Sequence, residues 1–266
     1  RKTDVINECI EEGEEKQEIS EFDDKLKKAL DIPKYAENNF TGLKKAFINQ
    51  VHLFNENHFA TVLKFFGYIV TRKYQTLYLK ETEKGTLEST LQKEVLSNTS
   101  KMIIAYGVAR AMKHLHDNKI IHRNLNTAAI VIDGRYYPYL SDLYYAKKET
   151  ENLPYVVKET RKEFMAPEFL RDFQNNQNSY AVDAYSYGIL LFTIVTQKNP
   201  FSKKKFNAKD VINGERPKLP GHTEEHWKEL ITQCWNGDPA ARPSFTQICE
   251  KLEADSVKLK YISEDD

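Results

Sequence analysis

A polar cluster between two apolar runs holds the residues of this sequence that are best suited to chemistry. His122, Arg123, Asn124 and Asn126 lie between an isoleucine pair at 120–121 and the apolar run 130–132. The Asn124 amide can orient a hydroxyl group, but it has no appreciable basicity near neutral pH and cannot accept a proton. The cluster can therefore position a group, but Asn124 cannot act as a general base.

The same stretch, H-R-N-L-N-T-A-A, resembles the catalytic loop H-R-D-L-K-P-E-N of eukaryotic protein kinases. In that family the Asp accepts the proton of the substrate hydroxyl and the last Asn binds magnesium. The resemblance places Asn124 at the base position, Asn126 at the catalytic-loop lysine and Ala129 at the metal-binding asparagine. It implies that these three positions have lost their chemistry while the apolar frame around them is kept.

Further motifs extend the resemblance over nearly the whole chain. Asp142 stands where the family has the metal-binding Asp of D-F-G, and Glu168 ends a run that matches A-P-E. Asp183 begins D-A-Y-S-Y-G, which is similar to D-x-x-S-x-G, and Arg242 follows C-W-N-G-D-P, as in the tyrosine-kinase-like branch. The resemblance implies that Asp183 binds the backbone of the catalytic loop and that Glu168 and Arg242 form a buried salt bridge.

The nucleotide site implied by the resemblance is degraded. Gly13 would begin the Gly-rich loop, but Glu15 and Glu18 occupy its second and third glycine positions, where carboxylates obstruct and repel phosphate. Lys34 takes the place of the phosphate-binding lysine, unless it is one of many exposed lysines. Gln50 replaces its glutamate partner and cannot offset a buried charge.

We therefore expect no required cofactor, weak ATP binding at most and doubtful magnesium binding, because Ala129 offers no oxygen beside Asp142. The resemblance implies a pseudokinase that acts in signalling as a scaffold or allosteric regulator. Its partner would be a protein, either an active kinase or flanking domains of a longer chain. The alternatives are a weak Ser/Thr kinase that works through Asp142 and Lys34, and a nucleotide-binding conformational sensor.

The segment 142–168 is the candidate switch. It contains the hydroxyls of Thr150, Tyr155 and Thr160, and in the family the residue matched by Arg123 pairs with a phosphate in this segment. His122 is expected to have a structural role. Ordinary loop composition is the alternative explanation for the three hydroxyls.

The pattern of apolar residues predicts an α+β, bilobal protein kinase-like fold. Short apolar pieces in residues 1–80 predict a small antiparallel β lobe with one helix near 43–54, at the αC position of the family. A hinge is expected at 81–84, a larger α-helical lobe at 85–257 and a polar tail at 258–266. Apolar stripes predict two of its helices, one with Met102, Ile103, Tyr106, Ala109, Met112 and Leu115, the other with Tyr185, Ile189, Phe192 and Val195.

Composition narrows the class of partner. Lys plus Arg equals Asp plus Glu at 39 each, so no net charge attracts nucleic acid or an anionic membrane. The longest apolar run, 187–195, is too short for a membrane span. Cys9, Cys234 and Cys249 show no paired spacing, which favours a reducing, cytoplasmic location. The chain begins at Arg1, and we expect it to be a domain of something longer.

Overall fold

The structure is a computed structural model that describes residues 29–31, 46–47, 49–54, 61–70, 75–151, 161–172, 179–201 and 206–262. The chain divides into two units. One comprises Arg1–His58 and Leu63–Glu81, and the other comprises Phe59–Val62 and Thr82–Asp266. The second unit resumes within the segment 81–84 that the sequence suggests as a hinge.

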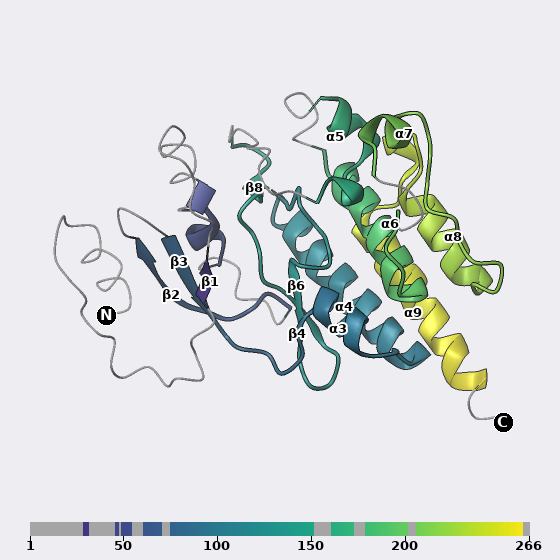
Figure 1. The fold of residues 1–266 in the computed structure, drawn as a ribbon, viewed down its shortest axis with the longest axis horizontal. Coiled ribbons are helices and arrows are strands. Elements are labelled where there is room, and N and C mark those ends of the chain that lie inside the picture. Colours follow the sequence, from purple (N-terminus) through teal and green to yellow (C-terminus); the bar gives the residue numbers. More distant parts are fainter. Residues whose placement is uncertain are drawn as a thin grey trace. The chain divides into compact units, whose positions relative to one another are not determined.

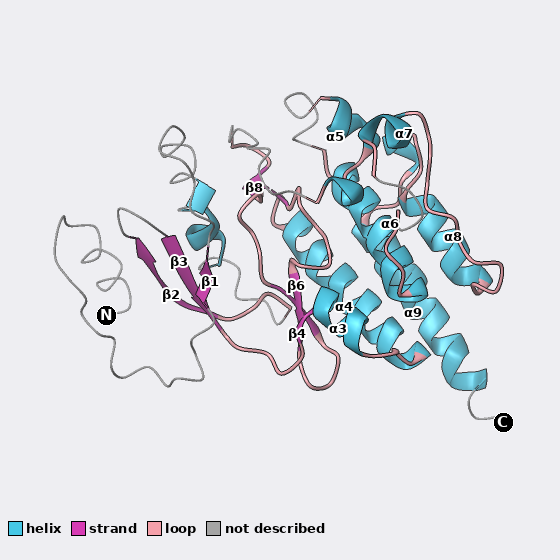
Figure 2. Ribbon diagram, in the orientation of Figure 1, coloured by secondary structure: helices cyan, strands magenta, loops and turns pink. Residues whose placement is uncertain are grey.

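The described part of the first unit contains a three-stranded antiparallel sheet in the order β1-β3-β2 (Figure 2). Its strands are β1 (Ala29–Asp31), β2 (Phe65–Val70) and β3 (Gln75–Leu79). Leu77 and Leu79 alternate with the less buried Tyr78, the pattern of a strand with one face toward a core. All three strands lie within residues 1–80, where short apolar pieces predicted a small antiparallel β lobe.

A helix packs on this sheet through aromatic side chains. Residues 46–47 and 49–54 are helical, within the range 43–54 predicted from the spacing of apolar residues. The Phe47 and Tyr68 rings meet edge to face at 5.9 Å, and Phe54 stacks on Phe65 at 5.9 Å. Such pairs favour a fixed helix–sheet contact beyond the area they bury.

Two small antiparallel sheets of the second unit fix the ends of the polar loop 122–129. One sheet has the order β4-β6-β7, with strands β4 (Gly85–Thr86), β6 (Ile130–Ile132) and β7 (Pro138–Leu140). The other pairs β5 (Ile120–Ile121) with β8 (Lys147–Lys148). Since β5 ends at Ile121 and β6 begins at Ile130, the loop is anchored in a different sheet at each end.

Most of the regular structure in the described part of the second unit is helical, and α4, α6 and α9 lie side by side (Figure 1). The helices are α3 (Leu87–Lys93), α4 (Asn98–Asp117), α5 (Pro167–Arg171), α6 (Ala181–Thr196), α7 (Ala208–Ile212), α8 (Glu225–Cys234) and α9 (Phe245–Ile262), with 3₁₀ turns η3 (Lys162–Phe164) and η4 (Pro239–Ala241). The predicted α+β class is confirmed. Because α9 continues to Ile262, the segment expected as a polar tail from 258 begins as helix.

The predicted stripe on α4 is partly wrong. Met102, Ala109, Met112 and Leu115 are buried, but Ile103 and Tyr106 are only half-buried, while Ile104, Ala105 and Val108 are buried in addition. Tyr106 lies at the edge of the α4–α9 contact, where its hydroxyl donates to Glu253 of α9. Contacts with α9, α6 and β7 therefore bury a wider arc of α4 than one stripe provides.

The single stripe predicted on α6 is too narrow. Every residue from Val182 to Ile194 is buried, whereas Val195, the last residue of the stripe, is half-buried. A helix that is buried all round lies inside a domain rather than on its surface. α6 is thus the central element against which the loop 122–129 is built.

Two buried tyrosines on α6 differ in whether their hydroxyl groups are hydrogen-bonded, so removing each hydroxyl should change the stability in opposite directions. The Tyr185 hydroxyl is buried with no hydrogen-bond partner among the described residues, and burial raises its pKa to about 12. The Tyr187 hydroxyl donates to the Ala105 carbonyl at 2.8 Å. An unsatisfied buried polar group costs about 1–3 kcal/mol, whereas a made hydrogen bond contributes about 1 kcal/mol.

We therefore expect Tyr185→Phe to raise the free energy of unfolding by about 1 kcal/mol and Tyr187→Phe to lower it by a similar amount. Both changes remove only an oxygen from a buried ring, so each is the control for the other. Urea denaturation followed by circular dichroism measures the two values. A loss of stability in both variants would contradict this account of the Tyr185 hydroxyl.

The described cysteines are free and buried. Burial raises the pKa of the Cys249 thiol to about 11 and raises that of Cys234 as well, so both are unreactive core residues. Cys9 lies outside the described residues. Across the described ranges, none of the helices has the length and apolar character needed to cross a membrane.

Candidate functional site

The loop 122–129 is held by a carboxylate from the first turn of α6. Asp183 is fully buried, and its two oxygens accept hydrogen bonds from the backbone N–H groups of His122 and Arg123, each at 2.8 Å. The His116 ring lies 2.9 Å from the same carboxylate. This is the contact that the kinase resemblance implies for Asp183, and it ties the loop to the centre of the unit.

Burial alone would raise the pKa of Asp183. The hydrogen bond and charge of His116, followed by the favourable interactions with His122, outweigh this effect and hold its pKa below the usual range. The charged carboxylate of Asp183 is thus the form that accepts the two backbone N–H groups of the loop. The contact also fixes Arg123 at φ 64°, a left-handed conformation that a residue with a side chain adopts only when its surroundings impose it.

His122 is a buried, neutral residue of this loop. Its side chain is 1 % exposed, and its Nδ1 lies 3.3 Å from the backbone N–H of Asn124, which donates to it. Nε2 has no partner among the described residues. Burial lowers the pKa of His122, although the Asp183 and Asp142 carboxylates act in the opposite direction. The imidazole is therefore fixed inside the loop, and the structural role expected for it from the sequence stays a prediction.

The lowered pKa of His122 predicts a loss of stability on mild acidification. In the unfolded chain His122 takes up a proton near its ordinary pKa of 6.5, whereas the folded state resists protonation, so the unfolded state gains protons as the pH falls below 6.5. We expect the free energy of unfolding to fall between pH 7 and pH 5, with a shallower dependence in His122→Gln. Urea titrations at several pH values measure this, and the exposed His222→Gln is the control. Equal slopes in His122→Gln and the parent would contradict the prediction.

The amide of Asn126 makes two hydrogen bonds within the loop. Its Nδ2 donates to the Asn124 carbonyl at 2.7 Å, and its Oδ1 accepts the Ala128 N–H at 2.8 Å. Asn126 is 2 % exposed and Asn124 is 9 % exposed. A lysine has donors only and could not accept the second bond. Asn126 therefore closes the loop on itself at the position that the resemblance gives to the catalytic-loop lysine.

The metal-binding positions implied by the resemblance offer one carboxylate. Asp142 is half-buried, and its Oδ1 accepts the backbone N–H of Tyr144 at 2.9 Å. Ala129 is buried and has only a methyl side chain, while its carbonyl accepts both the N–H and the hydroxyl of Ser141. The described residues contain no cluster of three potential metal-binding side chains. This donor set does not fit a magnesium site that needs two side-chain ligands.

Arg123 lies beside a second buried cation that the sequence reasoning missed. The Arg123 Nε donates to the Tyr145 carbonyl at 2.6 Å, and Lys147 in β8 is completely buried. Burial, followed by repulsion from Arg123, lowers the pKa of Lys147, whose ammonium donates to the Glu151 carbonyl. Arg123 and Lys147 are thus two cationic side chains of low exposure that repel each other. Thr150 is exposed in the same segment, whereas Tyr155 and Thr160 lie outside the described residues.

A second missed contact crosses from the end of the candidate switch segment to α3. Arg161 donates to both Glu88 oxygens, each at 2.7 Å, and both side chains are about one-third exposed. The backbone N–H of Glu88 donates to the Thr127 carbonyl at 3.1 Å. Glu88 therefore links the end of the candidate switch segment 142–168 to helix α3 and to the loop 122–129. No local pattern indicates a pair that is separated by 73 residues.

Glu168 and Arg242 form the bidentate ion pair that the resemblance implies. The Arg242 Nη1 and Nη2 lie 2.6 Å and 2.8 Å from the two Glu168 oxygens, and the guanidinium side chain is fully buried. Arg242 also donates to the carbonyls of Ala181 and Asn236. The pair therefore joins α5, the start of α6 and the segment before α9.

The nucleotide-binding positions in the first unit stay predictions. Gly13 and Lys34, together with the two glutamates at 15 and 18, lie outside the described residues. Gln50 is helical and 2 % exposed, and its Oε1 has no hydrogen-bond partner among the described residues. Its amide is in the buried position expected for the αC glutamate, but without the charge.

Similar proteins include several kinases. Serine/threonine-protein kinase STY17 of Arabidopsis thaliana is 28 % identical over 78 % of this chain and 37 % of its own length. The dual specificity protein kinase shkC of Dictyostelium discoideum is 27 % identical over 78 % of this chain and 43 % of its own. The RGS domain-containing serine/threonine-protein kinase A of the same organism is 32 % identical over 68 % of this chain and 16 % of its own. The chain thus spans less than half the length of these relatives.

A family-wide comparison covers more of the chain. The sequence profile described as protein tyrosine and serine/threonine kinase matches residues 10–252. This range includes the loop held by Asp183, the Asp142 position and the Glu168–Arg242 pair. The chain therefore contains a protein kinase domain and belongs to the protein tyrosine and serine/threonine kinase family.

Proposed function

We propose that this kinase domain is a pseudokinase of the tyrosine-kinase-like branch, which acts in signalling by binding a protein partner as a scaffold or allosteric regulator. The partner is an active kinase or the flanking domains of a longer chain. The observation that carries the proposal is the pair of hydrogen bonds made by the Asn126 side chain, which donates to one backbone group of the loop and accepts from another. These two bonds fix the amide within the loop, and an amide carries no positive charge to attract a phosphate.

The expected loss of rate is large. Loss of a general base removes a factor of roughly 10² to 10⁴, and loss of an electrostatic contact to the transferred group removes roughly 10² to 10³. These factors do not multiply simply. Asn124 cannot accept the proton, and Ala129 offers no metal ligand, so the site lacks two independent parts of the chemistry. Residual transfer should fall far below that of an ordinary kinase.

A weak Ser/Thr kinase is the second candidate. It is favoured by relatives that are named serine/threonine-protein kinases and by the presence of Asp142, which would hold magnesium with phosphate oxygens as the remaining ligands. In this case ATP is a substrate and not a required structural cofactor. A third candidate, binding of nucleotide without transfer, would make the domain a conformational sensor.

The pair of buried cations, Arg123 and Lys147, supports a switch in the segment 142–168. A phosphate on Thr150, Tyr155 or Thr160 would carry about −1.5 to −2 charge at neutral pH and could be held by these cations. Such a contact would order the segment and change the surface offered to a partner. The free, buried thiols Cys234 and Cys249 favour a reducing, cytoplasmic location for this activity.

A phosphotransfer assay with radiolabelled ATP and magnesium separates the candidates. We expect the parent chain to transfer no more phosphate than the Asp142→Ala variant. We also expect Asn124→Asp to restore no transfer, because Asn126 still closes the loop and Ala129 still offers no metal-binding side chain. Transfer that disappears on Asp142→Ala would overturn the pseudokinase proposal. An ATP-dependent rise in melting temperature without transfer would instead favour the sensor, since a ligand that binds the folded state stabilises it.

A further inference from the structure

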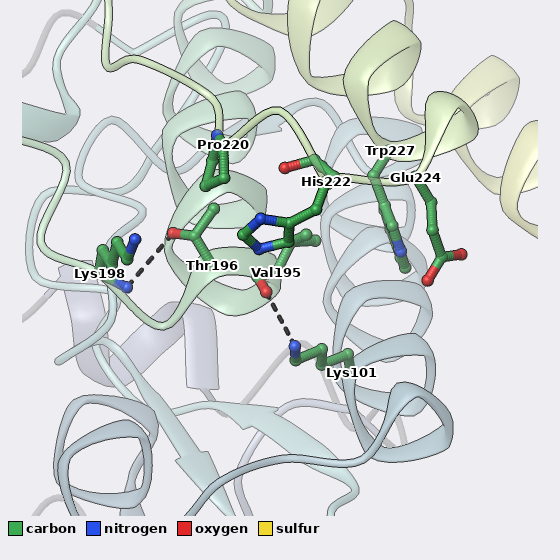
Figure 3. A pocket seen from close by; sticks show the side chains of 9 residues that line it. Lys101, Val195, Thr196, Lys198, Pro220, His222, Glu224 and Trp227 are labelled. Atoms are coloured by element: carbon green, nitrogen blue, oxygen red, sulfur yellow. Dashed lines mark hydrogen bonds between the residues drawn. The ribbon is translucent and has the colours of Figure 1, made fainter.

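A cavity of about 190 Å³ lies in the second unit, away from the loop 122–129 (Figure 3). It is formed by the end of α6, one residue of α4 and the segment that leads into α8. Lys198, His222 and Glu224 line it and are exposed, so its mouth opens to solvent. None of the residues discussed for phosphotransfer lines it.

Three of the side chains that line the cavity are apolar. Trp227 is 4 % exposed, and Pro220 and Val195 are the other two. Thr223 also lines the cavity and is 7 % exposed. Apolar groups that lie beside a hydroxyl suit an aliphatic side chain that carries a polar end.

Positive charge exceeds negative charge at the rim. Lys101 donates to the Val195 carbonyl at 2.9 Å, which uses one of the three N–H groups of its ammonium. Lys198 is exposed, and its backbone N–H is held by the Thr196 hydroxyl at 3.3 Å. Figure 3 shows Lys101 reaching toward the end of α6, where Thr196 and Lys198 follow. Two lysines therefore offer donors to an anion.

Glu224 is the single carboxylate among the described residues that line the cavity. It is engaged elsewhere, because one oxygen accepts from Asn98 at 3.3 Å and the other lies 3.5 Å from the His226 ring. Lys198 and Glu224 stand at opposite sides of the view in Figure 3. Figure 3 draws Lys101 between them, so Lys198 lies on the side of the view away from this carboxylate.

We propose that this cavity binds an acidic peptide segment of a protein partner, with a glutamate or aspartate at the two lysines and a neighbouring apolar side chain against Trp227. The volume is that of a side chain rather than of a nucleotide, and the open mouth lets a peptide backbone pass outside. This inference rests on the proposed role in protein binding and names the chemistry of the partner. It does not depend on whether phosphotransfer is lost.

Fluorescence anisotropy of a labelled peptide tests the proposal on the whole chain. The probe is a decapeptide of alternating glutamate and leucine, and the control probe has glutamine in place of glutamate. We expect the acidic peptide to bind at least about tenfold more tightly, and Lys198→Glu to weaken its binding by about tenfold or more. The matched control Lys209→Glu makes the same charge change at an exposed lysine of α7 and should stay within about twofold.

The site itself is checked by NMR. The chain has two tryptophans, and the indole N–H signal of Trp227, assigned through Trp227→Phe, should shift on titration while that of Trp235 does not. Equal affinity for the acidic and glutamine peptides, an equal effect of the two lysine variants, or an unmoved Trp227 signal would each overturn the proposal. A preference for a phosphorylated serine peptide over the acidic one would also overturn it. None of these outcomes alters the phosphotransfer result, so the two proposals fail separately.

Discussion

Asp183→Ala is expected to lower the free energy of unfolding by about 4 kcal/mol, because two buried backbone N–H groups lose their acceptor and each such loss costs roughly 1–3 kcal/mol. The groups belong to His122 and Arg123, each 2.8 Å from the carboxylate. Arg123 then also loses the bond that holds its left-handed backbone conformation. For a domain of this size, about 4 kcal/mol corresponds to a fall of roughly 8–16 °C in Tm.

Two variants make this expectation specific. Asp117→Ala removes the same side chain from an exposed ion pair with Lys113 on α4, and its effect should be small. Asp183→Asn keeps one acceptor oxygen but turns an amide donor toward a backbone donor, so its loss should lie between the two. Melting curves and urea denaturation measure all three. The proposed role of Asp183 would be wrong if Asp183→Ala were no more harmful than Asp117→Ala.

The framework of the second unit could be predicted because its residues belong to short motifs with fixed partners. The contacts of Asp183 and the Glu168–Arg242 pair are found in the structure as the resemblance implied. In each case a charged side chain is buried, and a buried charge needs a specific partner. Sequence patterns therefore indicate such residues well.

The packing around α4 and α6 could not be predicted in the same way. Apolar spacing reveals one inward face, but α6 is buried from Val182 to Ile194 and α4 is covered on several sides. A helix whose residues are apolar on all sides carries no periodic signal that separates its faces. The half-burial of Tyr106 depends on Glu253 from a distant helix, which no local pattern contains.

The candidate site was predictable in its residues but not in its contacts. Asn126 was read only as the loss of a lysine, whereas the structure gives its amide two bonds within the loop. Arg161 and Glu88 were missed, because an ion pair that closes over 73 residues leaves no trace in spacing. Lys147 was missed because lysine is usually exposed, and its burial follows from the pairing of β8 with β5.

Glu168→Ala is expected to lower the free energy of unfolding by about 3–5 kcal/mol, because it leaves the buried guanidinium of Arg242 without its counter-charge. Arg242 is fully buried, and Glu168 is 13 % exposed. Solvent can therefore replace little of what the carboxylate supplies. The remaining bonds of Arg242, to the carbonyls of Ala181 and Asn236, satisfy donors but do not neutralise the charge.

A double-mutant cycle with Glu168→Ala, Arg242→Ala and the double variant isolates the interaction between the two side chains. We expect a coupling energy of about 2–3 kcal/mol from urea denaturation, against a much smaller value for the exposed Lys251–Glu229 pair, where the ammonium lies 3.2 Å from the carboxylate. Equal coupling in the two pairs would contradict the role of burial. A large coupling that persists in Asn124→Asp would mean that the ion pair stabilises α5, α6 and α9 independently of the residue at the base position.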